Sequence, residues 1–290
     1  MNFSKRCLIC APHNDTLYAH VNIENNDIWL FCCKCDRGYT VYDYCYRAGI
    51  SMAEFLKQDF DFQESRPNEI TPMEFPRWFV PLSDPRAEKG VQYLKSRGLE
   101  IENLDVYYDI DNEGIVLPLY YENVFAGAQV RFIVPRKLSD GDEWKMTTIP
   151  GTRIGLLFSN WAQTTLLPHI KAVIVTEGFF NAVAIQQALN KQYGGLLNNP
   201  FKVIGCNGSG GTAHHIETMK ELKDSGMKII LAPDSDSSGL KMLKKFNDYN
   251  AITHYALTGD SDQDWNDKLK NMHHQEFARY FLTQIKKIKG

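Results

Sequence analysis

The sequence predicts an α/β protein in which a small cysteine-rich β unit, a linker and a β-rich basic segment precede a parallel-sheet α/β domain. Six of the seven cysteines lie in the first 45 residues. Prolines then recur every four or five residues from position 67 to position 85. From residue 172 onward, short apolar strands alternate with helical patterns, which is typical of a parallel sheet with helices on both faces.

The composition is that of an ordinary globular protein with room for about two domains. The 290 residues are 43% hydrophobic and 23% charged, which excludes a disordered or fibrous chain. The net charge of −3 means that any contact with nucleic acid must come from local basic patches. No apolar run approaches the ~18 residues of a membrane helix, and the start lacks the apolar core of a secretory signal. We therefore expect a cytoplasmic protein without membrane contact.

The N-terminal cysteines have the spacing of a zinc ribbon. Cys7 and Cys10 form one knuckle and Cys32 and Cys35 a second, with 21 residues between them. Two knuckles of two thiolates each give a tetrahedral zinc site. His13 also follows Cys10 at knuckle spacing, so Cys10 and His13 with the second knuckle form a competing ligand set. The stretch between the knuckles predicts two strands about the polar turn at residues 24–27, as a ribbon requires.

A helix over residues 39–58 is expected to close the ribbon, and the proline-rich stretch then reads as an extended linker. After it, a short helix over residues 85–97 leads into strands separated by polar turns. Five basic residues follow in this β-rich segment, and their alternative interpretation is a solvated strand edge. They are Arg131, Arg136, Lys137, Lys145 and Arg153. The predicted parts of the chain are 1–58 (ribbon), 59–85 (linker), 86–165 (basic subdomain), 166–260 (α/β domain) and 261–290 (helical segment).

Acidic residues follow the predicted parallel strands. Glu177 comes directly after the strand at 172–176, and Asp234 and Asp236 follow the strand at 228–232. Because ligands bind at the carboxyl ends of such strands, these carboxylates are expected to converge. Grouped carboxylates repel one another, and Mg²⁺, completed by water and substrate phosphates, relieves the repulsion. Isolated aspartates at strand ends are also frequent helix N-caps, which is the plainer alternative.

Two other ligand sites are excluded by spacing. The run from Asp234 to Gly239 matches the start of an EF-hand calcium loop, but Lys245 stands where the loop needs a bidentate Glu. The glycine-rich loop at 205–211 lacks both the ending of a phosphate-binding P-loop and the spacing of a dinucleotide fingerprint.

The two motifs VIVTEGFFNAVAI and IILAPDSDSSGLKML together resemble the Toprim domain of bacterial-type primases, topoisomerases and some nucleases. With the ribbon upstream and the segments YLKSRGL, AQVRF, EWKMT and IGLLFS between, the order of the whole chain resembles a phage- or bacterial-type DNA primase. Only the ribbon and Toprim motifs are sharp matches.

The resemblance implies a nucleotidyltransferase that makes short RNA primers on single-stranded DNA from ribonucleoside triphosphates. It implies structural Zn²⁺ and catalytic Mg²⁺, with Mn²⁺ as an alternative, and a separate helicase partner, since no P-loop is present. Glu177, Asp234 and Asp236 match the family's metal-binding acids, and Asp264 falls where a further acid lies. Arg131 and Lys145 fall near basic residues that engage nucleotide phosphates and template. If the chain is phage-encoded, the compartment is the host cytoplasm.

One departure from the family pattern concerns the acidic site. The family commonly has an aspartate three residues after the Glu-Gly pair, and this chain has Asn181. A neutral amide brings no charge, so we expect the metal affinity or the number of metal ions to differ. Two other functions remain open: a non-catalytic Toprim and zinc DNA-binding protein of the recombination-mediator kind, and a Toprim nuclease. Only a primase incorporates nucleotides.

Overall fold

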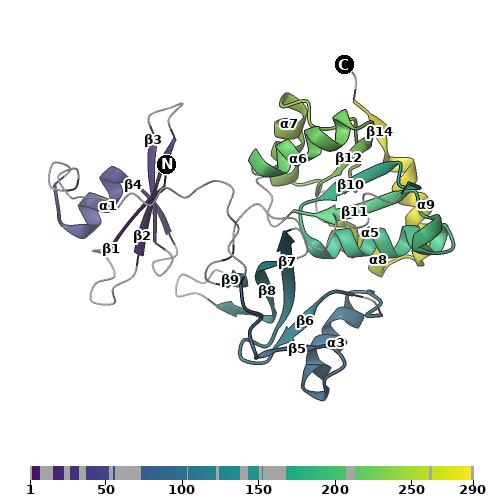
Figure 1. Ribbon diagram of the computed structural model, residues 1–290, viewed down its shortest axis with the longest axis horizontal. Helices are drawn as coiled ribbons and strands as arrows, with labels where there is room; N and C mark the ends of the chain where they lie inside the picture. Colours follow the sequence, from purple (N-terminus) through teal and green to yellow (C-terminus); the bar gives the residue numbers. More distant parts are fainter. Residues whose placement is uncertain are drawn as a thin grey trace. The chain divides into compact units, whose positions relative to one another are not determined.

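The structure is a computed structural model in which the chain forms two compact units, Met1–Glu69 and Ile70–Gly290 (Figure 1). The residues that it describes are 2–6, 16–22, 27–32, 37–51, 55, 73–102, 104–121, 124–137, 143–149, 152, 168–206, 213–260 and 263–288. Among these residues, no helix has both the length and the apolar composition needed to cross a membrane.

The first unit is a four-stranded antiparallel sheet followed by a helix. In sheet order the strands are β1 (Asn2–Arg6), β2 (Thr16–Asn22), β3 (Asp27–Cys32) and β4 (Arg37–Thr40). The pairing of β2 with β3 confirms the predicted hairpin around residues 24–27. The helix α1 (Val41–Ala48) begins later than expected, because residues 39 and 40 belong to β4 and pair with β3. Tyr44 and Phe55 are buried and meet edge to face with ring centroids 5.7 Å apart.

The second unit begins with a five-stranded antiparallel sheet. In sheet order its strands are β5 (Phe79–Pro81), β6 (Tyr107–Asp109), β7 (Gly114–Tyr121), β8 (Val124–Lys137) and β9 (Glu143–Thr148). β5 lies inside the stretch predicted as linker, and its pairing with β6 makes the end of that stretch part of the sheet. Phe75 also packs on Tyr107 and Phe125, so the expectation of a linker up to residue 85 is wrong at its C-terminal end.

Between β5 and β6 the chain forms the helical segment that the sequence predicted. It consists of the 3-10 turn η1 (Pro85–Ala87) and the helix α3 (Glu88–Ser96). The Asp84 carboxylate caps the start by accepting the Arg86 N–H at 2.9 Å. Gly98, with φ of +73°, ends the segment in the left-handed conformation that glycine adopts without steric cost.

The C-terminal part is a mainly parallel sheet. In sheet order its strands are β11 (Phe201–Gly205), β10 (Ala172–Thr176), β12 (Lys228–Ala232), β13 (His254–Tyr255) and β14 (Lys286–Lys287). The first four strands run parallel, as predicted, and β14 is an antiparallel edge. The strand expected over residues 252–257 is shorter, because only His254 and Tyr255 pair with β12.

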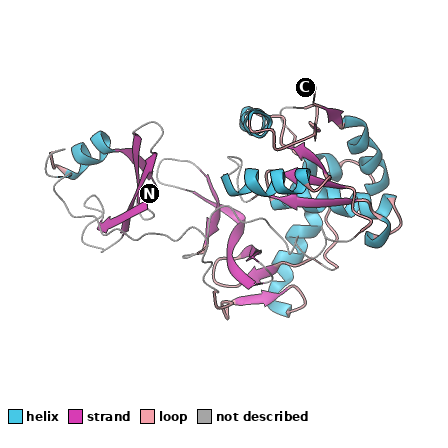
Figure 2. Ribbon diagram, turned by 45° about the horizontal axis from the view of Figure 1, so that its top comes forward, coloured by secondary structure: helices cyan, strands magenta, loops and turns pink. Residues whose placement is uncertain are grey.

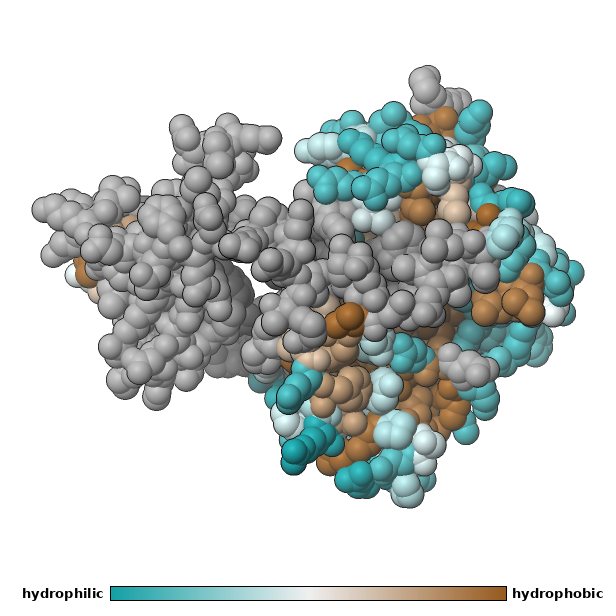
Figure 3. Space-filling model, in the orientation of Figure 1, coloured by the Kyte–Doolittle hydropathy of each residue, from teal (hydrophilic) through white to brown (hydrophobic). Residues whose placement is uncertain are grey.

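Helices pack on both faces of this sheet (Figure 2). The helices are α5 (Phe179–Gln192), α6 (Ala213–Asp224), α7 (Ser237–Asp248), α8 (Trp265–Lys270) and α9 (His274–Gln284), with the 3-10 turn η2 (Leu196–Asn198). Val173 and Val175 of β10 face α6 and α7, whereas Ile174 faces α5, α8 and α9. The outward surfaces of α6 and α7 are mostly hydrophilic, as amphipathic helices require (Figure 3).

The β-rich segment and the parallel-sheet domain share one hydrophobic core. Leu94 of α3 and Ile115 of β7 belong to the same buried cluster as Ile185 of α5 and Phe281 of α9. The parallel strands, whose carboxyl ends carry the acidic residues, therefore pack into a core to which both segments contribute.

Candidate metal centre

The parallel register brings two acidic loops to the same edge of the sheet. Thr176, the last residue of β10, pairs with Ala232, the last residue of β12. Glu177 and Asp234 thus leave the sheet side by side, and the Asp234 N–H donates to Glu177 Oε1 at 3.3 Å. The predicted convergence of these two residues is present in the fold.

Gly239 allows the first turn of α7 to approach these acids. A Cβ at this position would lie 2.0 Å from the Asp234 carbonyl oxygen and 2.6 Å from Glu177 Oε1. The carbonyl oxygen belongs to the backbone and cannot turn away from the added carbon, and the Glu177 carboxylate could do so only by giving up its contact with the Asp234 N–H. The glycine of the Asp-x-Asp-x-x-Gly motif is therefore required by close packing in the site.

Asp236 and Asp264 both cap helices. Asp236 Oδ1 accepts the Gly239 N–H at 2.7 Å at the start of α7, and Asp264 Oδ1 accepts the Asp267 N–H at 2.7 Å at the start of α8. The N-cap interpretation of these aspartates is thus correct, but it uses only one carboxylate oxygen of each. The second oxygen of each group is free of the capping bond and can bind a cation.

The carboxylates disfavour one another's ionisation. Burial raises the pKa of Asp234 to about 7. Three negative neighbours add to this rise, in decreasing order Glu177, Asp264 and Asp236, and a hydrogen bond from Asn181 opposes it. Burial, followed by the charge of Asp236, likewise raises the pKa of Glu177, although the Asp234 N–H works in the other direction.

The surroundings of Asp264 differ from those of Asp234 because positively charged side chains lie near Asp264 and lower its pKa. Burial raises its pKa, and the Asp267 charge adds to the rise. The Asp267 N–H, Arg97 and Lys270 lower it. Among the described residues, by contrast, no positive side chain contributes to the pKa of Asp234.

The donor set fits a hard divalent cation such as Mg²⁺. It offers carboxylate oxygens only, and its repulsion is relieved by positive charge. Within the described residues, no group of three or more His, Cys, Asp or Glu side chains is already arranged to hold an ion. Mg²⁺ commonly binds through one or two carboxylates and completes its shell with waters and substrate phosphates, so such a preformed cage is not required.

The other predicted site residues are less fully described. Cys7, Cys10, Cys35 and the alternative ligand His13 lie outside the described residues. Cys32 is the last residue of β3, and its side chain is likewise outside the description. The zinc site therefore stays a prediction.

Arg131 and Lys145 lie on neighbouring strands but on opposite faces of the sheet. Arg131 of β8 pairs with Met146 of β9, so their side chains share a face, and the adjacent Lys145 points to the other. The Arg131 Nε atom is buried and has no hydrogen-bond partner among the described atoms. Lys145 is exposed and lies 3.9 Å from Glu143 Oε2.

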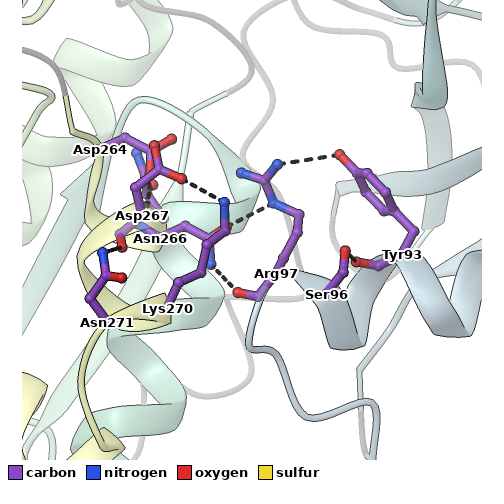
Figure 4. A network of polar contacts seen from close by, with 9 residues as sticks. Tyr93, Ser96, Arg97, Asp264, Asn266, Asp267, Lys270 and Asn271 are labelled. Atoms are coloured by element: carbon purple, nitrogen blue, oxygen red, sulfur yellow. Dashed lines mark hydrogen bonds and ion pairs between the residues drawn. The ribbon is translucent and has the colours of Figure 1, made fainter.

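Asn181, which stands at the position of a family aspartate, contacts the site directly, and two residues that the sequence did not assign to the site, Asn266 and Arg97, connect to it. Asn181 Nδ2 donates to Asp234 Oδ1 at 2.8 Å, and Asn181 Oδ1 accepts the Asn266 N–H at 3.0 Å. Asn266 in turn accepts from Arg97 Nε at 2.7 Å and donates to the Arg97 carbonyl at 2.9 Å (Figure 4). Arg97 and Asn266 are 169 positions apart, and no spacing rule could have paired them.

The chain is similar in sequence to a Toprim-like family model and in fold to a bacterial primase domain. Residues 174–269 match the Toprim-like family model, a range that contains all four acids and Asn181. The RNA polymerase domain of Mycobacterium tuberculosis primase, solved with a DNA oligomer, is 14% identical with a TM-score of 0.53, over 71% of this chain and 75% of that one. The primase fragment of the bacteriophage T7 primase-helicase is 15% identical with a TM-score of 0.41, over 92% and 93%.

No curated protein sequence matches the chain. At 14% identity, the likeness to the mycobacterial domain is one of fold. The resemblance seen in the sequence is confirmed at that level: residues 174–269 match the Toprim-like family model, and the chain shares the fold of a bacterial primase RNA polymerase domain.

Proposed function

We propose that this protein is a DNA primase, which synthesises short RNA primers on single-stranded DNA by metal-dependent nucleotidyl transfer. The observation that carries the proposal is the convergence of Glu177, Asp234 and Asp236 at the strand ends of a Toprim-like sheet. The shared fold with a primase domain solved together with DNA supports it.

In this proposal Asp234 and Asp236 hold Mg²⁺, with Asp264 as a further ligand. When bound, Mg²⁺ neutralises charge on the triphosphate and on the departing pyrophosphate. The 3′-hydroxyl of one nucleotide attacks the α-phosphorus of the next, and the bond to pyrophosphate breaks. Glu177 either accepts the hydroxyl proton or holds a second ion. Its raised pKa suits the proton acceptor, since a general base works best with a pKa near the working pH.

Basic residues outside the acidic site would bind phosphates and template. Arg131 is suited to a phosphate because the fixed fork of its guanidinium matches phosphate oxygens and its Nε has no described partner. Lys145, on the other face, suits a template strand that passes over β9. The ribbon would hold zinc through Cys7, Cys10, Cys32 and Cys35 and assist template selection, and a separate helicase would open the duplex.

The decisive experiment supplies labelled ribonucleotides, Mg²⁺ and a mixed-sequence single-stranded DNA template. Short labelled RNAs are expected from the native protein and from Asp248→Ala, which removes an exposed carboxylate of α7, but not from Asp234→Ala. Intact, bound DNA without product would indicate a non-catalytic DNA-binding protein. Degraded DNA in the absence of nucleotides would indicate a nuclease.

A further inference from the structure

Asn181 is a buried amide in contact with the acidic site. Only 5% of its surface is exposed, and it lies in the first turn of α5. Its Nδ2 is 2.8 Å from Asp234 Oδ1, and its Oδ1 is 3.0 Å from the backbone nitrogen of Asn266. One side chain therefore joins three elements: α5, the loop after β12 and the first turn of α8.

These two contacts fix which way the amide faces. A backbone N–H can only donate, so the atom of Asn181 that faces Asn266 must be the oxygen. The NH₂ group must then face Asp234, and it donates to the carboxylate. An aspartate at this position would place a second carboxylate oxygen against Asp234 Oδ1. The amide thus supplies a hydrogen bond where a carboxylate would repel.

Asn266, which donates to Asn181, is itself hydrogen-bonded to a residue of the β-rich segment. Asn266 is fully buried, and its side chain makes two reciprocal hydrogen bonds with Arg97, the residue after α3 (Figure 4). The Arg97 guanidinium also lies over the Phe180 ring, 4.7 Å from its centroid. The start of α8 is therefore hydrogen-bonded to α5 through Asn181 and to the end of α3 through Arg97.

We propose that Asn181 is a positioning residue that orients Asp234 for cation binding without itself acting as a ligand. The inference rests on the proposed function only in taking Asp234 as a metal ligand. Outer hydrogen-bond partners of ligating groups typically change metal affinity by about 10- to 100-fold when they are removed. Loss of the Asn181 amide should therefore weaken cation binding by roughly tenfold.

The test measures Mn²⁺ binding to the whole 290-residue chain, zinc-loaded, from the electron paramagnetic resonance signal of free Mn²⁺, without nucleotide or DNA. Asp234→Ala defines the signal that belongs to the site. Asn181→Ala is compared with Asn199→Ala, a matched control. Asn199 is also fully buried, donates Nδ2 to a side-chain oxygen (Asn190 Oδ1, 2.9 Å) and accepts a backbone N–H (Phe201, 3.0 Å), but it does not contact the acids.

We expect the Mn²⁺ dissociation constant to rise roughly tenfold in Asn181→Ala and to stay within about twofold in Asn199→Ala. A native value in folded Asn181→Ala, or equal changes in both variants, would overturn the proposal. So would the absence of Asp234-dependent Mn²⁺ binding in the native protein. If Asn181→Ala binds Mn²⁺ more weakly but the native protein makes no primers, the positioning role is supported and the proposed function is refuted.

Asn181→Asp covers the case in which the alanine variant does not fold, because it preserves the shape of the side chain. Its carboxylate faces Asp234, so the metal-free protein should unfold at a lower temperature at pH 8 than the native protein. Mn²⁺ should then raise its midpoint by more than it raises the native one. An equal gain in the two proteins would mean that residue 181 does not act on Asp234.

Discussion

At the scale of single residues, Asp234 is the group whose charge depends most on what is bound. Burial and three neighbouring carboxylates raise its pKa to about 7. Near neutral pH the metal-free site thus holds a proton or bears an unfavourable charge. A bound divalent cation favours the ionised form, so cation binding and proton release at Asp234 are coupled.

The raised pKa of Asp234 predicts how the stability of the metal-free protein depends on pH. The folded-state pKa of Asp234 lies above the usual 3.8. The contribution of this group to the free energy of unfolding is therefore fully present below pH 3.8 and is lost as the pH rises through about 7. Asp234→Asn keeps an acceptor for Asn181 and removes the charge. In magnesium-free buffer the variant should therefore unfold at a higher temperature than the native protein at pH 8, and the difference should vanish near pH 4.

The same pair of proteins gives the opposite order with magnesium. Mg²⁺ should raise the unfolding midpoint of the native protein at pH 8 and leave Asp234→Asn unchanged, since the main ligand is gone. Differential scanning fluorimetry measures both effects. The magnesium-free samples omit the ion rather than add a chelator, which would also remove zinc. A difference between the two proteins that does not change with pH would contradict the assigned pKa shift.

At the scale of elements, Asp264 combines two roles that one substitution would confuse. One of its oxygens caps α8, and the carboxylate is also a proposed cation ligand. Serine caps a helix but carries no negative charge, whereas alanine provides neither a cap nor a charge. Comparison of the two substitutions therefore separates the structural role from the binding role.

Asp264→Ala should have about 1 kcal/mol less unfolding free energy than Asp264→Ser, the usual value of an N-cap, because both variants lose the charge and only serine keeps the cap. Both should bind Mn²⁺ more weakly than the native protein if the carboxylate is a ligand. Urea unfolding in magnesium-free buffer measures the first effect, and a Mn²⁺ titration the second. Native Mn²⁺ affinity in Asp264→Ser would reduce Asp264 to a helix cap.

The elements also explain which features the sequence could predict. Glu177 and Asp234 were found because apolar strands precede them and parallel strands end at one edge, a local pattern with a fixed geometric consequence. β5 was missed because its three residues include Pro81, and proline reads as a strand breaker unless the strand is at an edge, as β5 is. The Arg97–Asn266 contact depends on tertiary packing alone, which no periodicity encodes.

At the scale of the whole molecule, the two units differ in what stabilises them. The second unit has one extended core shared by its two sheets. The first has about 70 residues, a size at which a single core rarely suffices without a metal or another cross-link. The proposed zinc would supply that cross-link, so its loss should unfold the first unit and leave the second intact.

Cys35→Ser, which removes one proposed ligand, tests this division. The variant should lose bound zinc and the protection of β2 and β3 against hydrogen exchange, while β10 and β12 stay protected. Cys45→Ala is the matched control, because Cys45 is a buried free cysteine of the same unit outside the knuckles, and it should keep its zinc. In primer synthesis, Cys35→Ser should impair initiation on single-stranded DNA more than extension of a pre-annealed primer, because the acidic site lies wholly in the second unit. Equal loss of initiation and extension, or loss of protection in both units, would show that the ribbon is required by the polymerase core itself.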